Sequence, residues 1–254
     1  MAAGLAYLLL HALPVFAQQP ADPPPAEPQV ADPDPLPPPP PVWSGTGELT
    51  ILATSGNVSS VTFGATGELA RQKGRWRTNA RAAFLRTTDR GLERGRSVLV
   101  QAQQSRAISS VLELFGRGQY QRDLFAGILQ RYSVDAGAGL VFAGPVQRLQ
   151  LTLGAGSTHE RRLNVPDQSI PVATAGVQYR FALSQDTTFT EEALATSSLT
   201  HGDDWRLDST AALTTIIRQP IALRVSYNTK YLNKPVPTFQ RLDTLLSVSL
   251  VARF

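Results

Sequence analysis

Three side chains suited to nucleophilic chemistry lie within four residues of one another. Ser157, His159 and Glu160 supply a hydroxyl, an imidazole and a carboxylate. A serine hydrolase needs these three types, with the histidine in hydrogen-bond reach of the serine. Ser157 and His159 share one face of an extended segment, which separates their side chains by roughly 7 Å. That gap is too long for a direct hydrogen bond, so we interpret His159 as a polar residue at a rim and predict no catalytic residue.

A second candidate is a cation site in the segment His201-Gly-Asp-Asp204, where an imidazole and two carboxylates follow one another. The same residues suit a solvated acidic loop. The chain has three histidines and no cysteine, so neither a histidine cluster nor a thiolate site is available. We therefore predict no metal and no cofactor.

Charges that recur at every second residue are the remaining chemical signal. Residues 241–254 place Leu242, Leu246 and Leu250 on one face, and Asp243 and Arg253 on the other. Sustained alternation over such a length is typical of a strand that crosses a membrane with one face in lipid. The predicted lumen-lining charges are Glu48, Glu68, Arg75, Arg77, Arg81, Glu113, Arg117, Asp135, Arg148, Arg180, Arg206, Asp208, Arg224, Lys230, Asp243 and Arg253. Mixed signs favour an interior filled by ion pairs, whereas the arginine excess favours an anion-preferring channel; the pattern leaves both open.

Strands must position these charges, and the alternation predicts about twelve of them. The expected ranges are 43–55, 58–70, 75–87, 95–107, 111–121, 125–142, 147–160, 170–184, 187–199, 204–218, 221–233 and 241–254. We expect a bulge at Glu191-Glu192, where the alternation breaks. The longer connections 88–94, 161–169, 200–203 and 234–240 are expected at one end, with short turns at the other. The fold class is therefore all-β: a closed antiparallel transmembrane β-barrel.

Aromatic residues sort toward the two ends of these strands, as expected for girdles at the lipid head groups. Those expected at the periplasmic edge are Trp43, Trp76, Phe142, Phe181, Phe189 and Phe254. Those expected at the outer edge are Phe84, Tyr120, Phe125, Trp205 and Tyr231.

The chain before the barrel has two further regions. Residues 1–17 resemble a signal peptide, with an apolar run from Leu5 to Leu13 and a small-residue cleavage pattern ending at Ala17. Residues 18–42 form a Pro-rich linker, since 12 of the 22 residues from Pro20 to Pro41 are proline. Such a segment cannot pair in a sheet, so we expect a disordered periplasmic linker. The barrel then occupies residues 43–254.

A net charge of +4 spread along the strands gives no basic tract, which argues against nucleic-acid binding. We expect the partners to be outer-membrane lipid and the outer-membrane assembly machinery, which would read the C-terminal Phe254. Small solutes are partners under the channel alternative.

One motif carries a family resemblance. Its residues are Trp43, Gly45, Glu48, Thr54, Ser55, Gly56 and Asn57, and later segments such as Gly67-Glu68 and Arg75-Trp76 continue it. The pattern resembles the YdiY-like family of salt-induced outer-membrane proteins over residues 43–254. The resemblance implies a barrel in the outer membrane of a Gram-negative bacterium and assigns it no reaction. The expected role is structural or in envelope stress, without catalysis. A narrow channel for small anionic solutes is the alternative, and an outer-membrane lipid-modifying enzyme is a remote one.

Overall fold

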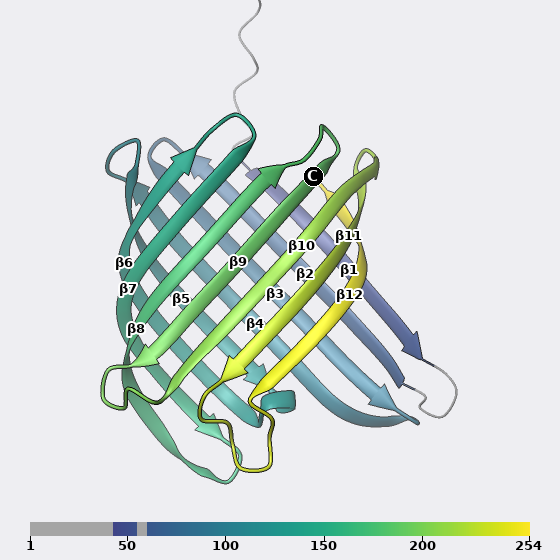
Figure 1. Ribbon diagram of the computed structural model, residues 1–254, viewed down its shortest axis with the longest axis vertical. Coiled ribbons are helices and arrows are strands. Elements are labelled where there is room, and N and C mark those ends of the chain that lie inside the picture. The colour runs from purple at the N-terminus through teal and green to yellow at the C-terminus, as the bar shows by residue number, and fades with distance from the viewer. Residues whose placement is uncertain (1–42, 55–59) are drawn as a thin grey trace, which may run out of the picture. The chain divides into compact units, whose positions relative to one another are not determined.

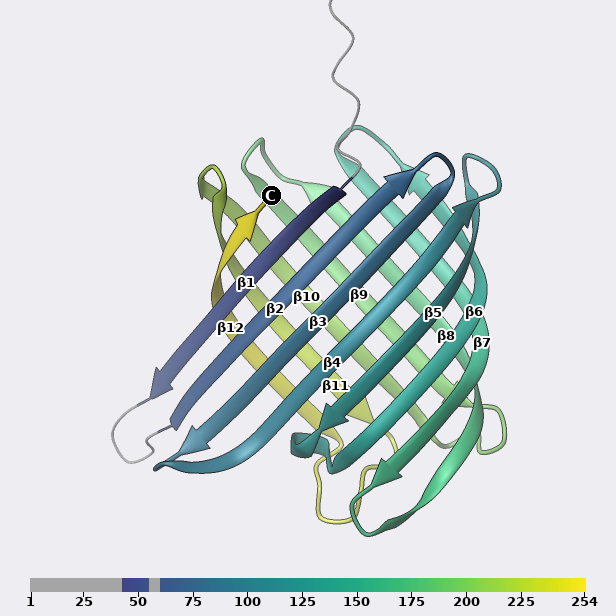
Figure 2. The ribbon, with the colours of Figure 1, turned by 180° about the vertical axis from the view of Figure 1, so that it is seen from behind.

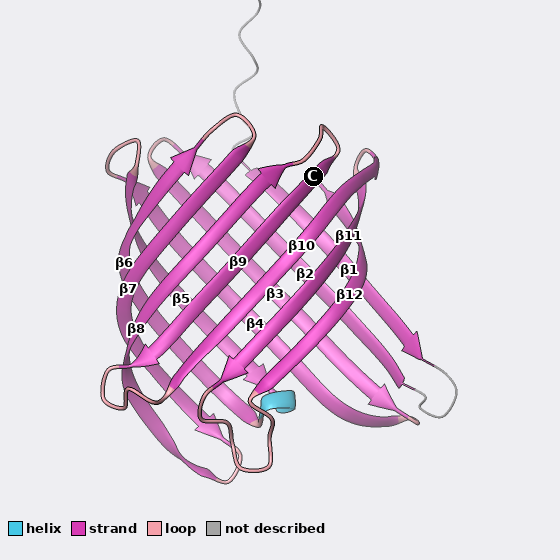
Figure 3. Cartoon of the chain, viewed as in Figure 1, coloured by secondary structure: helices cyan, strands magenta, loops and turns pink. Residues whose placement is uncertain are grey.

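A computed structural model of the protein describes residues 43–54 and 60–254. The predicted signal peptide and linker, and Ser55, Gly56 and Asn57 of the motif, lie outside these residues. Twelve strands make up nearly all of the described chain (Figure 1, Figure 3). They are β1 (Trp43–Thr54), β2 (Ser60–Lys73), β3 (Trp76–Asp89), β4 (Leu92–Ala107), β5 (Leu112–Asp123), β6 (Ile128–Ala143), β7 (Gln147–Arg162), β8 (Val165–Ala182), β9 (Thr187–Ser198), β10 (Trp205–Arg218), β11 (Ile221–Leu232) and β12 (Leu242–Arg253).

The strands close into an antiparallel barrel in sequence order, with β12 returning to pair with β1. Both views show them strongly tilted (Figure 1, Figure 2). We call the end that carries Trp43 and Phe254 the terminal end, and the opposite end the loop end. A single 3₁₀ turn, η1 (Leu124–Ala126), follows β5 at the loop end. Within the two described ranges, no helix is long and apolar enough to cross a membrane.

The alternation places apolar side chains outside and polar side chains inside the barrel. Ile51, Leu153 and Leu246 are 68%, 70% and 63% exposed on the outer wall. On the same three strands, Thr50, Thr158 and Ser247 are buried on the inner side, although they are polar. A soluble protein would bury the apolar set instead. This arrangement is that of an outer-membrane β-barrel, whose outer surface contacts lipid.

The outer wall carries the predicted aromatic rings near both ends of its strands. At the terminal end, Trp43 and Trp76 stand on the outside, each with an arginine over its ring. At the loop end, Trp205 packs against Tyr231 with ring centroids 4.8 Å apart. The other girdle residues placed on the outer wall by the strand register are Phe84, Tyr120, Phe142, Phe181, Phe189 and Phe254.

Phe125 is the exception, because it lies inside the barrel. It belongs to η1, which turns inward after β5 and ends at Gly127 with a left-handed backbone, φ +68°. A Cβ added to Gly95 would stand 2.2 Å from the Phe125 ring, so only glycine leaves room for it. The expectation of a girdle position for Phe125 was wrong, because the strand predicted to begin at residue 125 begins only at Ile128.

Three other sequence expectations differ from the structure. The connections predicted at 88–94 and 161–169 are short turns, because the flanking strands continue beyond the predicted ends. Arg90 and Gly91 form the first turn with φ of +50° and +80°, the sign that suits a tight hairpin. The bulge expected at Glu191-Glu192 is absent, since β9 pairs in regular register with both β8 and β10. Glu191 therefore faces outward and Glu192 inward.

The barrel closes where β1 meets β12. Gly45 and Phe254 exchange backbone hydrogen bonds of 2.8 and 3.0 Å. A Cβ on Gly45 would stand 2.4 Å from the Phe254 ring. This contact gives a physical reason for one glycine of the sequence motif: the ring of Phe254 lies directly over it.

Candidate functional site

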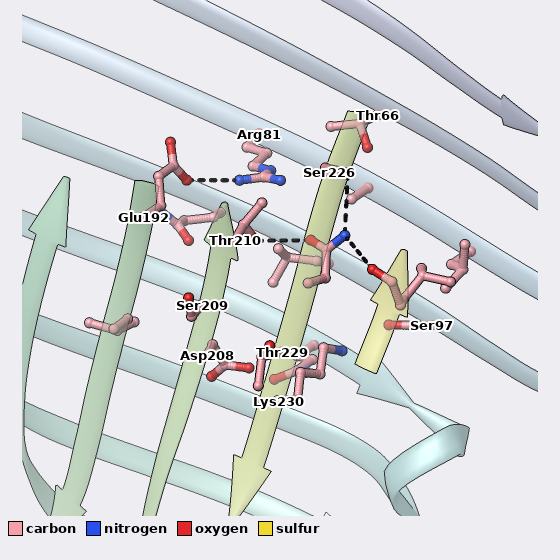
Figure 4. Close-up of a pocket in the computed structure, with 18 of the residues that line it drawn as sticks. Thr66, Arg81, Ser97, Glu192, Asp208, Ser209, Thr210, Ser226, Thr229 and Lys230 are labelled. Carbon is pink, nitrogen blue, oxygen red and sulfur yellow. Dashed lines mark hydrogen bonds and ion pairs between the residues drawn. The ribbon is translucent and has the colours of Figure 1, made fainter. Parts of the chain in front are cut away.

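The candidate site is the barrel lumen, which holds a cavity of about 450 Å³. Amide and hydroxyl side chains supply much of its lining, including Gln101, Gln119 and Asn228. Thr66 and Ser226 belong to the same lining (Figure 4). Such groups hydrogen-bond water, so the cavity is a polar compartment inside an apolar wall. Charged side chains from the predicted set project into the same space.

An ion pair crosses the middle of the lumen. Arg81 of β3 donates to Glu192 of β9 over 3.3 Å (Figure 4). These strands lie opposite each other, since five strands separate them on either side of the ring. Arg81 also lies 3.4 Å from Glu68 on the neighbouring strand. One guanidinium therefore joins two walls of the barrel and narrows the cavity that surrounds it.

A second ion pair crosses nearer the loop end. Lys230 of β11 donates to Asp123 at the end of β5, and these strands also stand opposite each other. Asp208 and Asp243 lie within electrostatic range of Lys230. The ammonium thus sits among three carboxylates, which hold it across the lumen.

About half of the other predicted lumen charges are paired along the wall. Arg117 holds Asp135 through two hydrogen bonds of 2.6 and 3.0 Å, the fork geometry that makes such pairs strong. Arg224 lies 3.4 Å from Glu48. The prediction that ion pairs fill the interior therefore describes much of the lumen. Of the predicted lumen-lining charges, Arg75 is the one that does not face the lumen. It lies in the exposed turn between β2 and β3.

Sequence reasoning missed a buried network at the loop end. Glu160, with no exposed surface, accepts hydrogen bonds from Arg131, Arg162 and Gln168. Arg131 is only 2% exposed and also donates to Gln121. The signal was present, because Arg131 has the same parity as Asp135 on β6, and Glu160 the same parity as Arg148 on β7. Arg206 lies within electrostatic range of both Arg131 and Glu160.

Three arginines near the terminal end, Arg148, Arg180 and Arg253, lack such partners. Arg148 on β7 stands directly opposite Arg180 on β8, and both side chains face the lumen. Arg148 lies within electrostatic range of Arg77, and Arg180 within range of Arg253. Among the described residues, Arg148, Arg180 and Arg253 form no ion pair within 4.0 Å. This end of the lumen is consequently electropositive.

The structure separates the residues of the hydrolase candidate. Ser157 and His159 face outward, and His159 Nδ1 lies 2.8 Å from Ser169 Oγ in a hydrogen bond. Glu160 faces the lumen and is held by arginines. The carboxylate therefore points away from the imidazole that it would have to orient.

The side chains of the candidate cation site likewise each interact with a different partner. Asp203 pairs with Lys234, Asp204 lies 3.7 Å from Arg162, and His201 hydrogen-bonds Thr200. The hydrogen bond from Lys234 lowers the pKa of Asp203 below its ordinary value. Residues 43–54 and 60–254 contain no group of three histidine, cysteine or acidic side chains placed to hold a metal ion.

The extent of the barrel coincides with a sequence family. A family model described as "Protein of unknown function, DUF481" matches residues 47–254. The chain belongs to the DUF481 family. This match agrees with the predicted barrel region and with a family to which no reaction is assigned. The narrower YdiY-like name, and induction by salt, stay predictions from the sequence motif.

Solved structures similar to this DUF481 chain include outer-membrane proteins. The NanC porin aligns at 10% identity and a TM-score of 0.48, covering 83% of this chain and 97% of that one. An outer-membrane channel from Pseudomonas putida F1 aligns at 12% identity and a TM-score of 0.49, covering 84% and 95%. The translocator domain of the autotransporter NalP from Neisseria meningitidis aligns at 13% and 0.44, covering 84% and 86%. No curated protein matches the chain significantly.

Proposed function

We propose that this DUF481 protein is a narrow, passive channel for small hydrophilic solutes in the cell outer membrane, without catalytic activity. The observation that carries the proposal is the polar cavity of about 450 Å³, which extends around the ion pair between Arg81 and Glu192. A barrel that served only as a wall would gain by filling this space with packed side chains. Polar groups that remain open to water instead offer a small solute hydrogen bonds along its path.

The proposal includes an orientation. The described turns at the terminal end are short, such as Gly74–Arg75 and Gln219–Pro220, whereas the loop end carries longer segments such as 233–241. Outer-membrane barrels have short periplasmic turns and longer external loops. The terminal end would therefore face the periplasm, and the Pro-rich linker would extend there.

The test is single-channel recording of the purified full-length protein in planar bilayers. Wild-type protein is expected to give small, steady current steps. Glu192→Ala removes the bridge and leaves Arg81 beside Glu68 on its own wall, so larger steps are expected. Glu191→Ala is the matched control, because the neighbouring residue faces lipid and should leave the step size unchanged.

A structural barrel with an envelope-stress role is the second candidate, and the two ion pairs that cross the lumen favour it. Cross-braces between opposite walls would stiffen the barrel as well as narrow it. Absence of current from both the wild type and the Glu192→Ala variant, each folded by gel mobility before and after heating, would overturn the channel and leave this role.

A further inference from the structure

The terminal end of the lumen contains a like-charge cross-strand pair that a structural role does not explain. Arg148 and Arg180 are direct cross-strand partners, and their side chains share the inner face with Gln150 and Gln178, which are also partners. Those two glutamines line the cavity. The arginine pair is one step further along the same face, at the edge of the cavity. Like charges placed directly opposite each other destabilise a sheet.

The carboxylate within electrostatic range of Arg148 is Glu113, which attracts it but forms no ion pair with it. Glu113 lies 3.8 Å from Arg77 and accepts a hydrogen bond from Gln150 Nε2. The Nη2 atom of Arg148 is buried and has no hydrogen-bond partner. A buried donor costs free energy unless water or a ligand supplies an acceptor for it.

We infer that Arg148 and Arg180 form a binding site for a small oxyanion, a phosphate or carboxylate group carried by a solute in the lumen. Two guanidinium groups present planar forks of donors that match the oxygens of such groups. Arg77 and Arg253 add positive charge nearby. An oxyanion between the two arginines would supply the acceptor that Arg148 lacks and neutralise the cross-strand repulsion. The site deepens the proposed channel function by naming its substrate class.

The first measurement needs no current. Inorganic phosphate is titrated into the detergent-solubilised full-length protein, and binding is followed by ³¹P nuclear magnetic resonance. The double variant Arg148→Gln with Arg180→Gln is expected to bind phosphate at least about tenfold more weakly, since each lost bond was made by a charged donor. Arg75→Gln is the matched control, because this arginine lies at the same end but in an exposed turn. Acetate added in competition with phosphate, and read from the same ³¹P signal, separates carboxylate from phosphate preference.

The second measurement is the reversal potential of the channel under a potassium chloride gradient. Wild-type protein is expected to prefer chloride, the double variant to lose that preference, and Arg75→Gln to keep it. Phosphate binding that disappears in the double variant, together with no current from any protein, supports the site and overturns the channel. Equal phosphate binding in wild type and double variant overturns the site, whatever the conductance.

Discussion

The two ends of the lumen balance their charges in different ways. At the loop end, Glu160 is enclosed by Arg131 and Arg162, and Lys230 reaches across to Asp123. At the terminal end, Arg148 stands opposite Arg180, and neither forms an ion pair with a described carboxylate. Charges that satisfy one another fix the structure and have little left to offer a ligand. Charges left without partners cost stability, and they remain available for binding.

The largest effect is expected from removing the carboxylate of the buried network at the loop end. Glu160→Ala leaves the buried Arg131 without its carboxylate and Arg162 with only the longer contact to Asp204, so the free energy of unfolding should fall by about 3–5 kcal/mol. Urea unfolding of the barrel in micelles, followed by tryptophan fluorescence, measures the change. Ser157→Ala, on the lipid side of the same strand, is the control. A loss below about 1 kcal/mol, the range of an exposed ion pair, would contradict the enclosed network.

At the terminal end, we expect a substitution to increase the free energy of unfolding. Arg148→Gln removes one member of a like-charge pair, so the free energy of unfolding should rise by roughly 0.2–1 kcal/mol. The gain should shrink as salt is added, because salt screens the repulsion in a wet lumen. The same urea titration at two salt concentrations measures it. Destabilisation by this variant would mean that Arg148 makes a contact that holds the fold.

The smallest effect concerns a paired charge outside the membrane span. Because Lys234 lowers the pKa of Asp203, the pair stabilises the loop above the ordinary pKa of aspartate. That contribution is lost as the pH falls through the lowered pKa of Asp203. Lys234→Ala should return the pKa of Asp203 toward its ordinary value. A carboxyl titration by nuclear magnetic resonance measures this, and an unchanged pKa would show that the hydrogen bond does not form in solution.

The sequence predicted all twelve strands, because alternation between lipid and water is a local property of each segment. The inward face of Arg148, Arg180 and Arg253 followed from the same rule. The pairing of Arg81 with Glu192 could not be predicted, because it depends on which strands stand opposite each other across the ring, 111 residues apart. Phe125 was misplaced for a related reason: the inward turn of η1 depends on the space above Gly95, which alternation does not encode.

The ladder between β1 and β12 runs only from Thr46 to Thr50, while that between β1 and β2 runs from Trp43 to Thr54. Beyond it, the exchange between Gly45 and Phe254 extends the junction by one further step. This junction joins the first strand to the last, so it can form only after all twelve strands have been synthesised. It is also the shortest hydrogen-bonded boundary in the wall, and a sideways opening toward lipid would begin there.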